Sequence, residues 1–241
     1  GNISAMWIAK QLSNKTEIIL PSSAHFSFEK IASLMSMKLK SIPVTTDYKM
    51  DVSQIKKQIN SKTVAVVGIA GSTDVGAIDP IPEISEICND EHIFFHVDAA
   101  FGGFIIPFLI NKGYSLPSID FSLAGISSIS LDAHKMGYAA IPLGTLVLRE
   151  KKWLDEISVS SQCISTKKQA GILGTRSGAP IAAGYAVTHY LGIKGYEKLA
   201  EDVMKLTSYC TKRITDIGLA LVTQPSLNVI AVQVNNLDEI V

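Results

Sequence analysis

The sequence predicts an α/β fold in which a mostly parallel sheet lies between two layers of helices. Up to about Arg149, short runs rich in branched apolar residues alternate with amphipathic segments of helical period. Two of the runs, residues 63–71 and 92–100, are apolar on both faces, as parallel strands covered on both sides are. Beyond residue 180 a long helical pattern leads into two strand-like runs, which favours part of a small α+β domain.

Period and punctuation place the individual elements. We expect helices at residues 3–12, 27–38, 51–60 and 81–90, with Asp51 as the cap of the third. We expect strands at residues 17–21, 39–44, 63–71, 92–100, 127–132 and 144–149, and in the small domain at 219–223 and 228–234. Residues 180–218 read as helical, with a break between Gly192 and Gly195. These elements suggest a large domain in residues 1–190 and the start of an incomplete small domain in residues 191–241.

Charge and hydropathy exclude two classes of partner. The 241 residues are 47% hydrophobic and carry a formal net charge of zero, whereas nucleic acids and anionic membrane surfaces require a basic excess. The most apolar stretch, residues 93–110, contains His96, Asp98 and Pro107, and a membrane helix needs about 20 apolar residues without such charges. We therefore expect this stretch to be buried core.

The three cysteines, Cys88, Cys163 and Cys210, are widely spaced and odd in number. They form neither a disulfide framework nor a CxxC pair, so we expect a reducing, cytoplasmic environment and no metal site. Both ends of the sequence are abrupt, with a helix directly at residue 1 and a strand near the last residue. We expect further segments beyond both ends.

The polar residues of interest follow predicted strands or open a predicted helix. In an α/β sheet, ligands bind beyond the carboxyl ends of the strands. These positions hold residues 1–4, His25, residues 71–73, Asp98 with Ala99 and Ala100, and residues 132–135. Taken singly each is weak, because Asp98 could be a strand-end cap and His25 a structural histidine. The ordered set is more specific.

Lys135 gives the set its chemistry. It follows a strand-like run and is flanked by apolar and small residues, which suggests a partly buried amine. An amine, a deep carboxylate, a histidine ring and a helix N-terminus together suit pyridoxal 5′-phosphate. The amine must be neutral to form a Schiff base, so burial must lower its pKa from about 10.4. The carboxylate keeps the pyridine nitrogen protonated, and the helix start binds the phosphate.

Five motifs carry a resemblance to a known family: "SSAHFSFEKIA", "GIAGSTDVGAIDPI", "HVDAAFGGFIIPF", "DAHKMGYAAIPLGTLVLR" and "ILGTRSGAP". With them the chain resembles the group II pyridoxal-phosphate-dependent amino-acid decarboxylases of fold-type I. It is most similar to the archaeal branch that acts on tyrosine or aspartate. The resemblance covers almost the whole chain. It implies a seven-stranded type of mostly parallel sheet between helices, with a small C-terminal domain.

The resemblance also implies roles for the residues around the coenzyme ring. Lys135 would be the Schiff-base lysine, and His25 would stack on the pyridine ring. Asp98 would pair with the ring nitrogen, and the small Ala100 would let the ring lie close on its other face. Ser72 would place a hydroxyl near the ring substituents.

The remaining implied residues concern the phosphate. Asn2, Ile3 and Ser4 would sit in the phosphate cup, and His134 would serve the phosphate and the geometry of the site. Thr175 resembles the residue that reaches the phosphate from the neighbouring subunit. That position implies a homodimer with shared active sites.

The sequence departs from the family in the loop at residues 159–170, which has no tyrosine where relatives carry one that helps to protonate Cα. Cys163 stands at that position. A thiol with a reference pKa near 8.5 can donate a proton, but the plainer interpretation is a small loop residue without a catalytic role. His25 is another candidate acid.

Further departures lie around the phosphate cup and the loop that follows it. The cup reads "NISAM", with Ala5 and Met6 in place of a polar pair, although the helix start remains. Asp132 would repel a phosphate, so we expect it to bind backbone or a partner residue. Arg176 could pair with a substrate carboxylate or with a structural acid, and the structural role is the simpler one.

Three functions remain open. The leading hypothesis is decarboxylation of an L-amino acid, aspartate or tyrosine, to the amine and carbon dioxide, as part of carboxylic acid metabolism. The second is a carbon–carbon lyase acting on a phosphorylated amino alcohol, which would need an additional basic site for the substrate phosphate. The third is a catalytically impaired paralogue that retains the fold.

Overall fold

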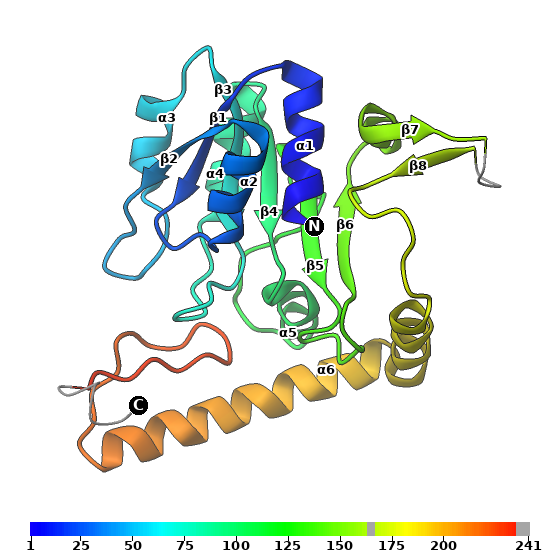
Figure 1. The fold of residues 1–241 in the computed structure, drawn as a ribbon. Coiled ribbons are helices and arrows are strands. Elements are labelled where there is room, and N and C mark those ends of the chain that lie inside the picture. Colours follow the sequence, from blue (N-terminus) through cyan, green and yellow to red (C-terminus); the bar gives the residue numbers. More distant parts are fainter. Residues whose placement is uncertain (163–166, 235–241) are drawn as a thin grey trace.

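A computed structural model describes residues 1–162 and 167–234 (Figure 1). Its main sheet has six strands in the order β2-β1-β3-β4-β5-β6. Their bounds are β1 (Glu17–Pro21), β2 (Lys38–Ile42), β3 (Thr63–Ile69), β4 (Phe94–Asp98), β5 (Ile126–Asp132) and β6 (Gly144–Leu148). The first five are mutually parallel, and β6 pairs antiparallel with β5. The predicted fold class is confirmed. Six strands stand where the resemblance implied seven, because no further extended run of the described chain pairs with either edge.

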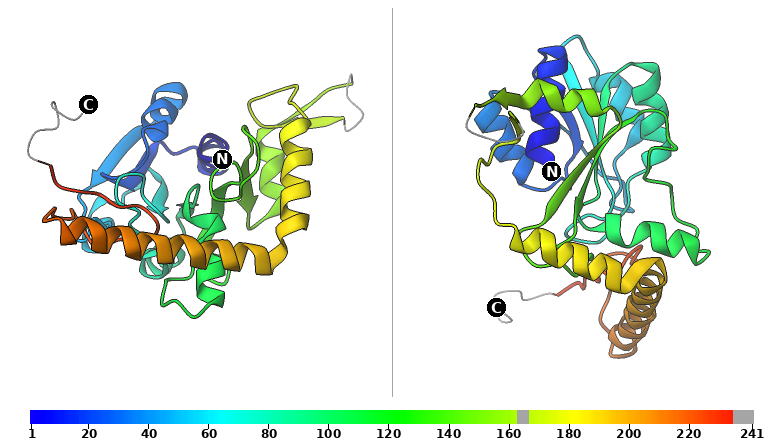
Figure 2. Two further views of the ribbon diagram at one scale, coloured as in Figure 1. Left: turned by 90° about the horizontal axis from the view of Figure 1, so that it is seen from below. Right: turned by 90° about the vertical axis from the view of Figure 1, so that its right-hand side faces the viewer.

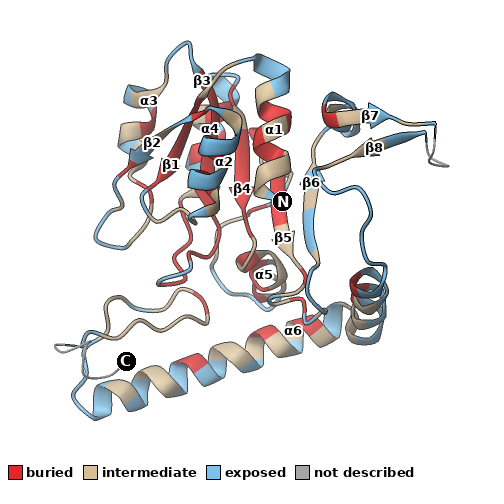
Figure 3. Ribbon diagram, viewed as in Figure 1, coloured by how far each residue is buried: buried red, intermediate tan, exposed pale blue. Residues whose placement is uncertain are grey.

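Helices cover both faces of this sheet. They are α1 (Asn2–Ser13), α2 (Ser27–Met35), α3 (Ile55–Gln58), α4 (Ile81–Asp90), α5 (Ile106–Asn111) and α6 (Ala179–Asp216). Short 3-10 turns are η1 (Val52–Gln54), η2 (Gly102–Phe104) and η3 (Lys151–Ile157), and a two-stranded ribbon joins β7 (Ser158–Ser160) to β8 (Lys168–Ala170). One apolar core lies between the sheet and α1 with α2, and a second lies under α4, α5 and α6. The central strands are accordingly buried (Figure 3).

The loop after β3 is fixed by a buried carboxylate. Asp79 accepts the backbone N–H groups of Ile69 and Met50, both at 2.7 Å, and burial raises the pKa of Asp79 to about 6. Gly71 follows the strand with φ of 100°, a conformation that side chains other than glycine rarely adopt, and donates its N–H to Ala77. The end of β3 is thereby held in one conformation.

Strands β4 and β5 change register in the middle of their pairing. Phe95 lies opposite Ile126, but the next residue, His96, lies opposite Ser128, and Asp98 lies opposite Ser130. Ser127 is the additional residue, and its hydroxyl accepts the Phe95 N–H at 3.2 Å.

The C-terminal part confirms one expectation and corrects another. Gly192 has φ of 55° and interrupts α6, as predicted, and both views in Figure 2 show the two halves of the helix meeting at a sharp bend. The two strands expected at residues 219–223 and 228–234 are wrong, because the segments share only an isolated antiparallel bridge between Leu221 and Val232. The chain between them turns inward instead and buries Leu227 against the apolar core.

The apolar stretch at residues 93–110 is divided among β4, η2 and α5 and is largely buried, as expected. No helix in the described part of the chain is long and apolar enough to cross a membrane.

Candidate active site

A cavity of about 800 Å³ opens where β1, β3, β4 and β5 end and α1 begins. Eight of the sequence-predicted site residues line it: Asn2, Ile3, Ser4, His25, Asp98, Ala100, Lys135 and Thr175. Ser72 and His134 do not line it. The topology explains this gathering, because the parallel strands all end at one edge and each is followed by a loop that carries a polar residue.

Asp98, the last residue of β4, is buried and surrounded by hydrogen-bond donors. Asn2 donates to its Oδ2 at 2.7 Å, and both the Ser130 hydroxyl and the Ala100 N–H donate to its Oδ1 at 3.1 Å. An ionised carboxylate can only accept hydrogen bonds, so this set of donors matches that form. The donors come from α1, β5 and the turn that follows β4, so three separate segments hold the side chain.

The start of α1 forms the wall beside Asp98. Gly1 precedes the helix without a side-chain cap, so the first-turn N–H groups have no side-chain partner there. The Asn2 amide is already committed to Asp98 and His96. Asn2 would therefore contact a phosphate through its backbone N–H. Ile3 and Ser4 would contact it through their backbone N–H groups as well.

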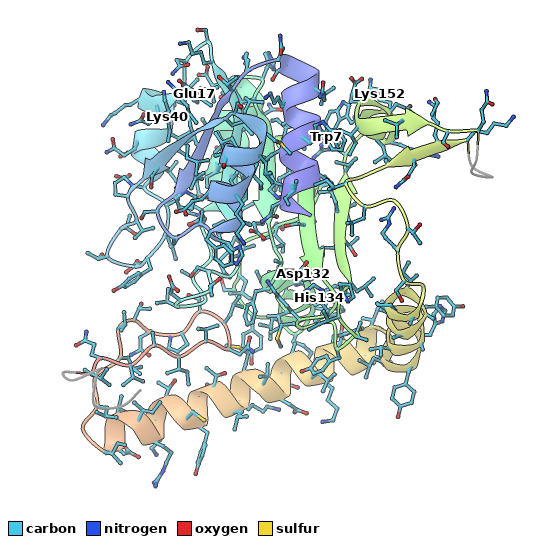
Figure 4. All side chains as sticks on the ribbon, in the orientation of Figure 1. Trp7, Glu17, Lys40, Asp132, His134 and Lys152 are labelled. Carbon is cyan, nitrogen blue, oxygen red and sulfur yellow. The ribbon has the colours of Figure 1, made fainter. Side chains whose placement is uncertain are left out.

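Lys135 occupies the opposite, more open wall. Its Nζ lies 3.2 Å from Asp132 Oδ2, and 42% of its side chain is exposed. The expected partial burial of this amine is wrong for the described chain, because Lys135 stands on a turn after β5 rather than inside the sheet. Asp132 forms its ion pair with Lys135, and His134 Nε2 lies 3.6 Å from the same carboxylate. Figure 4 shows Asp132 and His134 next to each other after β5.

The histidines near the cavity have defined roles as hydrogen-bond partners. His134 Nδ1 accepts the Leu143 N–H at 3.0 Å, which leaves Nε2 facing Asp132. His25 Nδ1 accepts the Ser27 N–H at 3.2 Å, and its ring lies 4.0 Å from that of Phe26. Nε2 is therefore the nitrogen of His25 that can carry an exchangeable proton.

Two neighbouring residues after β3 differ in placement. The Ser72 hydroxyl is buried and accepts the Ala77 N–H at 3.0 Å, whereas Thr73 lines the cavity. Arg176 also lines the cavity, and among the described residues it has no ion pair with a structural acid. Cys163 lies outside the described residues.

Sequence reasoning did not find His96, Ser128 and Ser130, which stand behind Asp98. His96 Nε2 is 3.1 Å from Asn2 Oδ1, and its Nδ1 is 2.8 Å from the Ser128 hydroxyl. The sequence could have indicated His96, because it lies two residues before Asp98 and side chains two apart on a strand share one face. The serines could not be placed, since the register shift between β4 and β5 is not visible in the sequence.

The fold and this cavity define the class of protein. A mostly parallel α/β sheet presents a lysine amine, a buried carboxylate, a histidine ring and a free helix start around one space of sufficient size. Amine, carboxylate and N–H groups are the donor and acceptor types that bind the aldehyde, the ring nitrogen and the phosphate of pyridoxal 5′-phosphate. The residues present therefore fit this cofactor, as in fold-type I enzymes.

Residues 4–233 match the family described as "Pyridoxal-dependent decarboxylase conserved domain", and the chain belongs to this family. The cofactor that the family implies is pyridoxal 5′-phosphate. The chain is 46% identical over 233 residues to a probable L-tyrosine/L-aspartate decarboxylase of Methanothermobacter thermautotrophicus, covering 96% of this chain and 64% of that protein. It is 44% identical over 245 residues to an L-aspartate/L-glutamate decarboxylase of Pyrococcus horikoshii, covering 100% of this chain and 64% of that protein. The resemblance inferred from the motifs is thus confirmed.

Solved structures agree on the fold. A sphingosine-1-phosphate lyase of Burkholderia pseudomallei superposes with a TM-score of 0.86 at 26% identity, over 98% of this chain and 57% of that one. A glutamate decarboxylase of Lactobacillus brevis superposes with a TM-score of 0.80 at 21% identity, over 92% of this chain and 56% of that one. The chain therefore spans less than two thirds of the length of these relatives.

Proposed function

We propose that this chain carries the cofactor-binding part of a pyridoxal-phosphate-dependent decarboxylase, which converts an L-amino acid to its amine and carbon dioxide. Aspartate and tyrosine are the proposed substrates, since both relatives reported above are named for aspartate and one of them for tyrosine as well. The observation that carries the proposal is the placement of Lys135, Asp98 and the start of α1 on one cavity.

Three groups of the chain would hold the cofactor. Lys135 Nζ would bind it covalently, Asp98 would pair with the ring nitrogen, and the amides of the first turn of α1 would bind the phosphate. His25 and Ala100 would face the two sides of the ring, and Thr175 would approach the phosphate. Once bound, the cofactor supplies an electron sink for the electrons left when the carboxylate departs from Cα.

The chain's own residues would manage the protons. Asp132 forms an ion pair with the Lys135 amine at 3.2 Å, and this pair would have to open for Nζ to bond to the cofactor. Protonation at Cα needs a donor on the cavity wall. We assign this role to Nε2 of His25, because its Nδ1 is occupied by the Ser27 N–H and no tyrosine is present in residues 159–170.

Arg176 is the proposed anchor for a substrate carboxylate. Arg176 lines the cavity and has no ion pair among the described residues, which supports a substrate role over the structural role favoured from the sequence. Guanidinium groups bind carboxylates through paired hydrogen bonds. An acidic amino acid carries two such groups.

We also propose a homodimer with shared sites. Large apolar side chains are exposed on the segment before Thr175 and at the start of α6: Ile172, Leu173 and Ile181, which line the cavity, and Tyr185. A second subunit would cover them, since exposed apolar side chains that lie together mark interfaces. We propose a large domain in residues 1–190 and a small domain that begins at residue 191, a division that falls two residues before the break at Gly192.

A cytoplasmic location is proposed because Cys88 and Cys210 are free thiols.

A carbon–carbon lyase is the second candidate, on the strength of the superposition with the sphingosine-1-phosphate lyase. Such an enzyme needs cations for a substrate phosphate in addition to those that hold the cofactor. Among the described lining residues the lysine and arginine side chains are Lys135 and Arg176, and Lys135 is assigned to the cofactor. Arg176 is then the one lysine or arginine side chain among the described lining residues that is left for a substrate, which favours the decarboxylase over the lyase. An impaired paralogue would need neither Lys135 nor Arg176, so the presence of both also favours the decarboxylase.

The decisive experiment assays the intact protein with added pyridoxal phosphate against a panel of L-amino acids, for carbon dioxide and for aldehyde release. We expect carbon dioxide from aspartate or tyrosine. The Lys135→Ala variant should lose the visible absorbance of the bound cofactor and at least about a thousandfold in rate, since it removes the nucleophile. Lys152→Ala, an exposed lysine outside the cavity, is the matched control and should keep both.

Aldehyde release without carbon dioxide would establish the lyase instead. Full cofactor occupancy with no turnover on any amino acid would establish the impaired paralogue. Retention of the cofactor absorbance in Lys135→Ala would refute the assignment of the lysine.

A further inference from the structure

We propose that Ser128, His96 and Asn2 are positioning residues for Asp98, joined in one chain of hydrogen bonds whose direction is set by a neutral imidazole with its proton on Nε2. The inference deepens the proposed function, because it concerns the carboxylate assigned to the ring nitrogen. The three residues come from β5, β4 and α1, so the chain joins three separate elements to the acidic group.

The direction of the chain follows from elimination, beginning at its acidic end. The ionised Asp98 carboxylate can only accept, so Asn2 presents its Nδ2 to Oδ2 at 2.7 Å. The amide oxygen of Asn2 must then face His96 Nε2 at 3.1 Å, and since that oxygen can only accept, Nε2 carries a proton. His96 Nδ1 in turn accepts from the Ser128 hydroxyl at 2.8 Å.

Burial supports the neutral form of this imidazole. His96 and Ser128 are both 0% exposed, so neither can exchange its partner for water. Burial is the main cause that lowers the pKa of His96 to about 4, with the nearby Asp98 acting against it. A neutral ring has one donor and one acceptor nitrogen, and both are used.

The chain of hydrogen bonds matters for the orientation of Asn2, because an asparagine amide has two nearly isosteric orientations. If its oxygen faced Asp98, two acceptors would oppose each other in a buried place and the carboxylate would lose its shortest hydrogen bond. The donor on His96 Nε2 stabilises only the orientation in which nitrogen faces Asp98. Ser130 and the Ala100 N–H remain as donors to the other oxygen of Asp98. Loss of the hydrogen bonds through Asn2 therefore makes the carboxylate less firmly held but does not release it.

The first test reads the proton directly. Nitrogen-15 spectra of the intact protein should show His96 neutral with its proton on Nε2 between pH 5 and 8, with or without pyridoxal phosphate. A proton on Nδ1, or a cationic ring at pH 7, would overturn the proposal. This measurement does not depend on the cofactor, so it stands even if the wild-type protein binds none, a result that would overturn the proposed function alone.

The second test uses matched substitutions and the affinity for pyridoxal phosphate, measured from the absorbance of the bound cofactor. His96→Leu removes the donor for Asn2 and should weaken binding about tenfold, whereas His96→Gln retains an N–H and should remain within about threefold. Ser128→Ala should weaken binding, while Ser85→Ala should not. Ser85 is also a buried serine, but its hydroxyl accepts the Gly125 N–H at 3.0 Å and is not part of the chain of hydrogen bonds that leads to Asp98.

Equal affinities in Ser128→Ala and Ser85→Ala, or an equal loss in His96→Leu and His96→Gln, would show that the residues act only as core packing. If His96→Leu does not fold, the serine pair and the nitrogen spectra decide the question.

Discussion

The two sides of the cavity are built in different ways. On the Asp98 side, a buried carboxylate at the end of a central strand receives donors from β5, from α1 and from the turn after β4. On the Lys135 side, an exposed amine on a turn is paired with Asp132, only three residues away. The sheet therefore fixes one half of the site within the chain, whereas the other half rests on local contacts that can rearrange when a ligand arrives.

The largest difference should appear when the acid on each side is removed. Asp98→Ala leaves three donors without an acceptor in a buried place and should lower the free energy of unfolding by about 3 kcal/mol. Asp132→Ala removes a partly exposed ion pair and should cost less than about 1 kcal/mol. Urea unfolding without cofactor measures both, and equal costs would contradict the contrast between the two sides.

The Asp98 side should also respond to pH through His96. The pKa of His96 falls from 6.5 to about 4 on folding, so between these values the unfolded chain binds the additional proton. The corresponding stability is fully present above pH 6.5 and is lost as the pH falls toward 4, by up to about 3 kcal/mol.

The measurement is the difference in unfolding free energy between wild type and His96→Gln across pH 4 to 8. Ser85→Ala, which removes no titrating group, should lower the wild-type curve without changing its shape. If the difference in unfolding free energy between wild type and His96→Gln does not vary with pH, the imidazole has the same pKa in the folded and unfolded states.

The smallest effect is expected at the open side of the cavity, at Arg176. Arg176→Gln should raise KM for an acidic amino acid about tenfold, the worth of a charge-assisted hydrogen bond, and leave the cofactor absorbance unchanged. Arg213→Gln, an exposed arginine in the last turn of α6, is the control. An unchanged KM in Arg176→Gln would remove this residue from substrate binding.

Much of the fold could be predicted, because hydrophobic period reports burial directly. The buried run predicted as a strand at residues 63–71 became β3 (Thr63–Ile69), two residues shorter, and Gly192 was placed correctly as a break in a helix. The strands expected at residues 219–223 and 228–234 failed for a tertiary reason. The chain between them buries Leu227 in the main core, and the two segments share only the bridge between Leu221 and Val232.

The site was predicted less evenly. Residues at strand ends, such as Asp98 and Lys135, could be brought together from topology alone, because parallel strands end at one edge. The exposure of Lys135 could not be foreseen, since apolar neighbours in sequence do not determine what covers a turn. Ser72 and Thr73 were indistinguishable by type, and only the backbone of the loop decides that Thr73 reaches the cavity.

The register shift at Ser127 makes the site depend on a residue count as much as on residue identity. If the two strands paired without this shift, Asp98 would lie opposite Ile129 instead of Ser130, and His96 would lie opposite Ser127 instead of Ser128. A slip of one residue in this pairing would put an apolar side chain opposite the carboxylate, while every named residue of the cofactor site remained in the sequence.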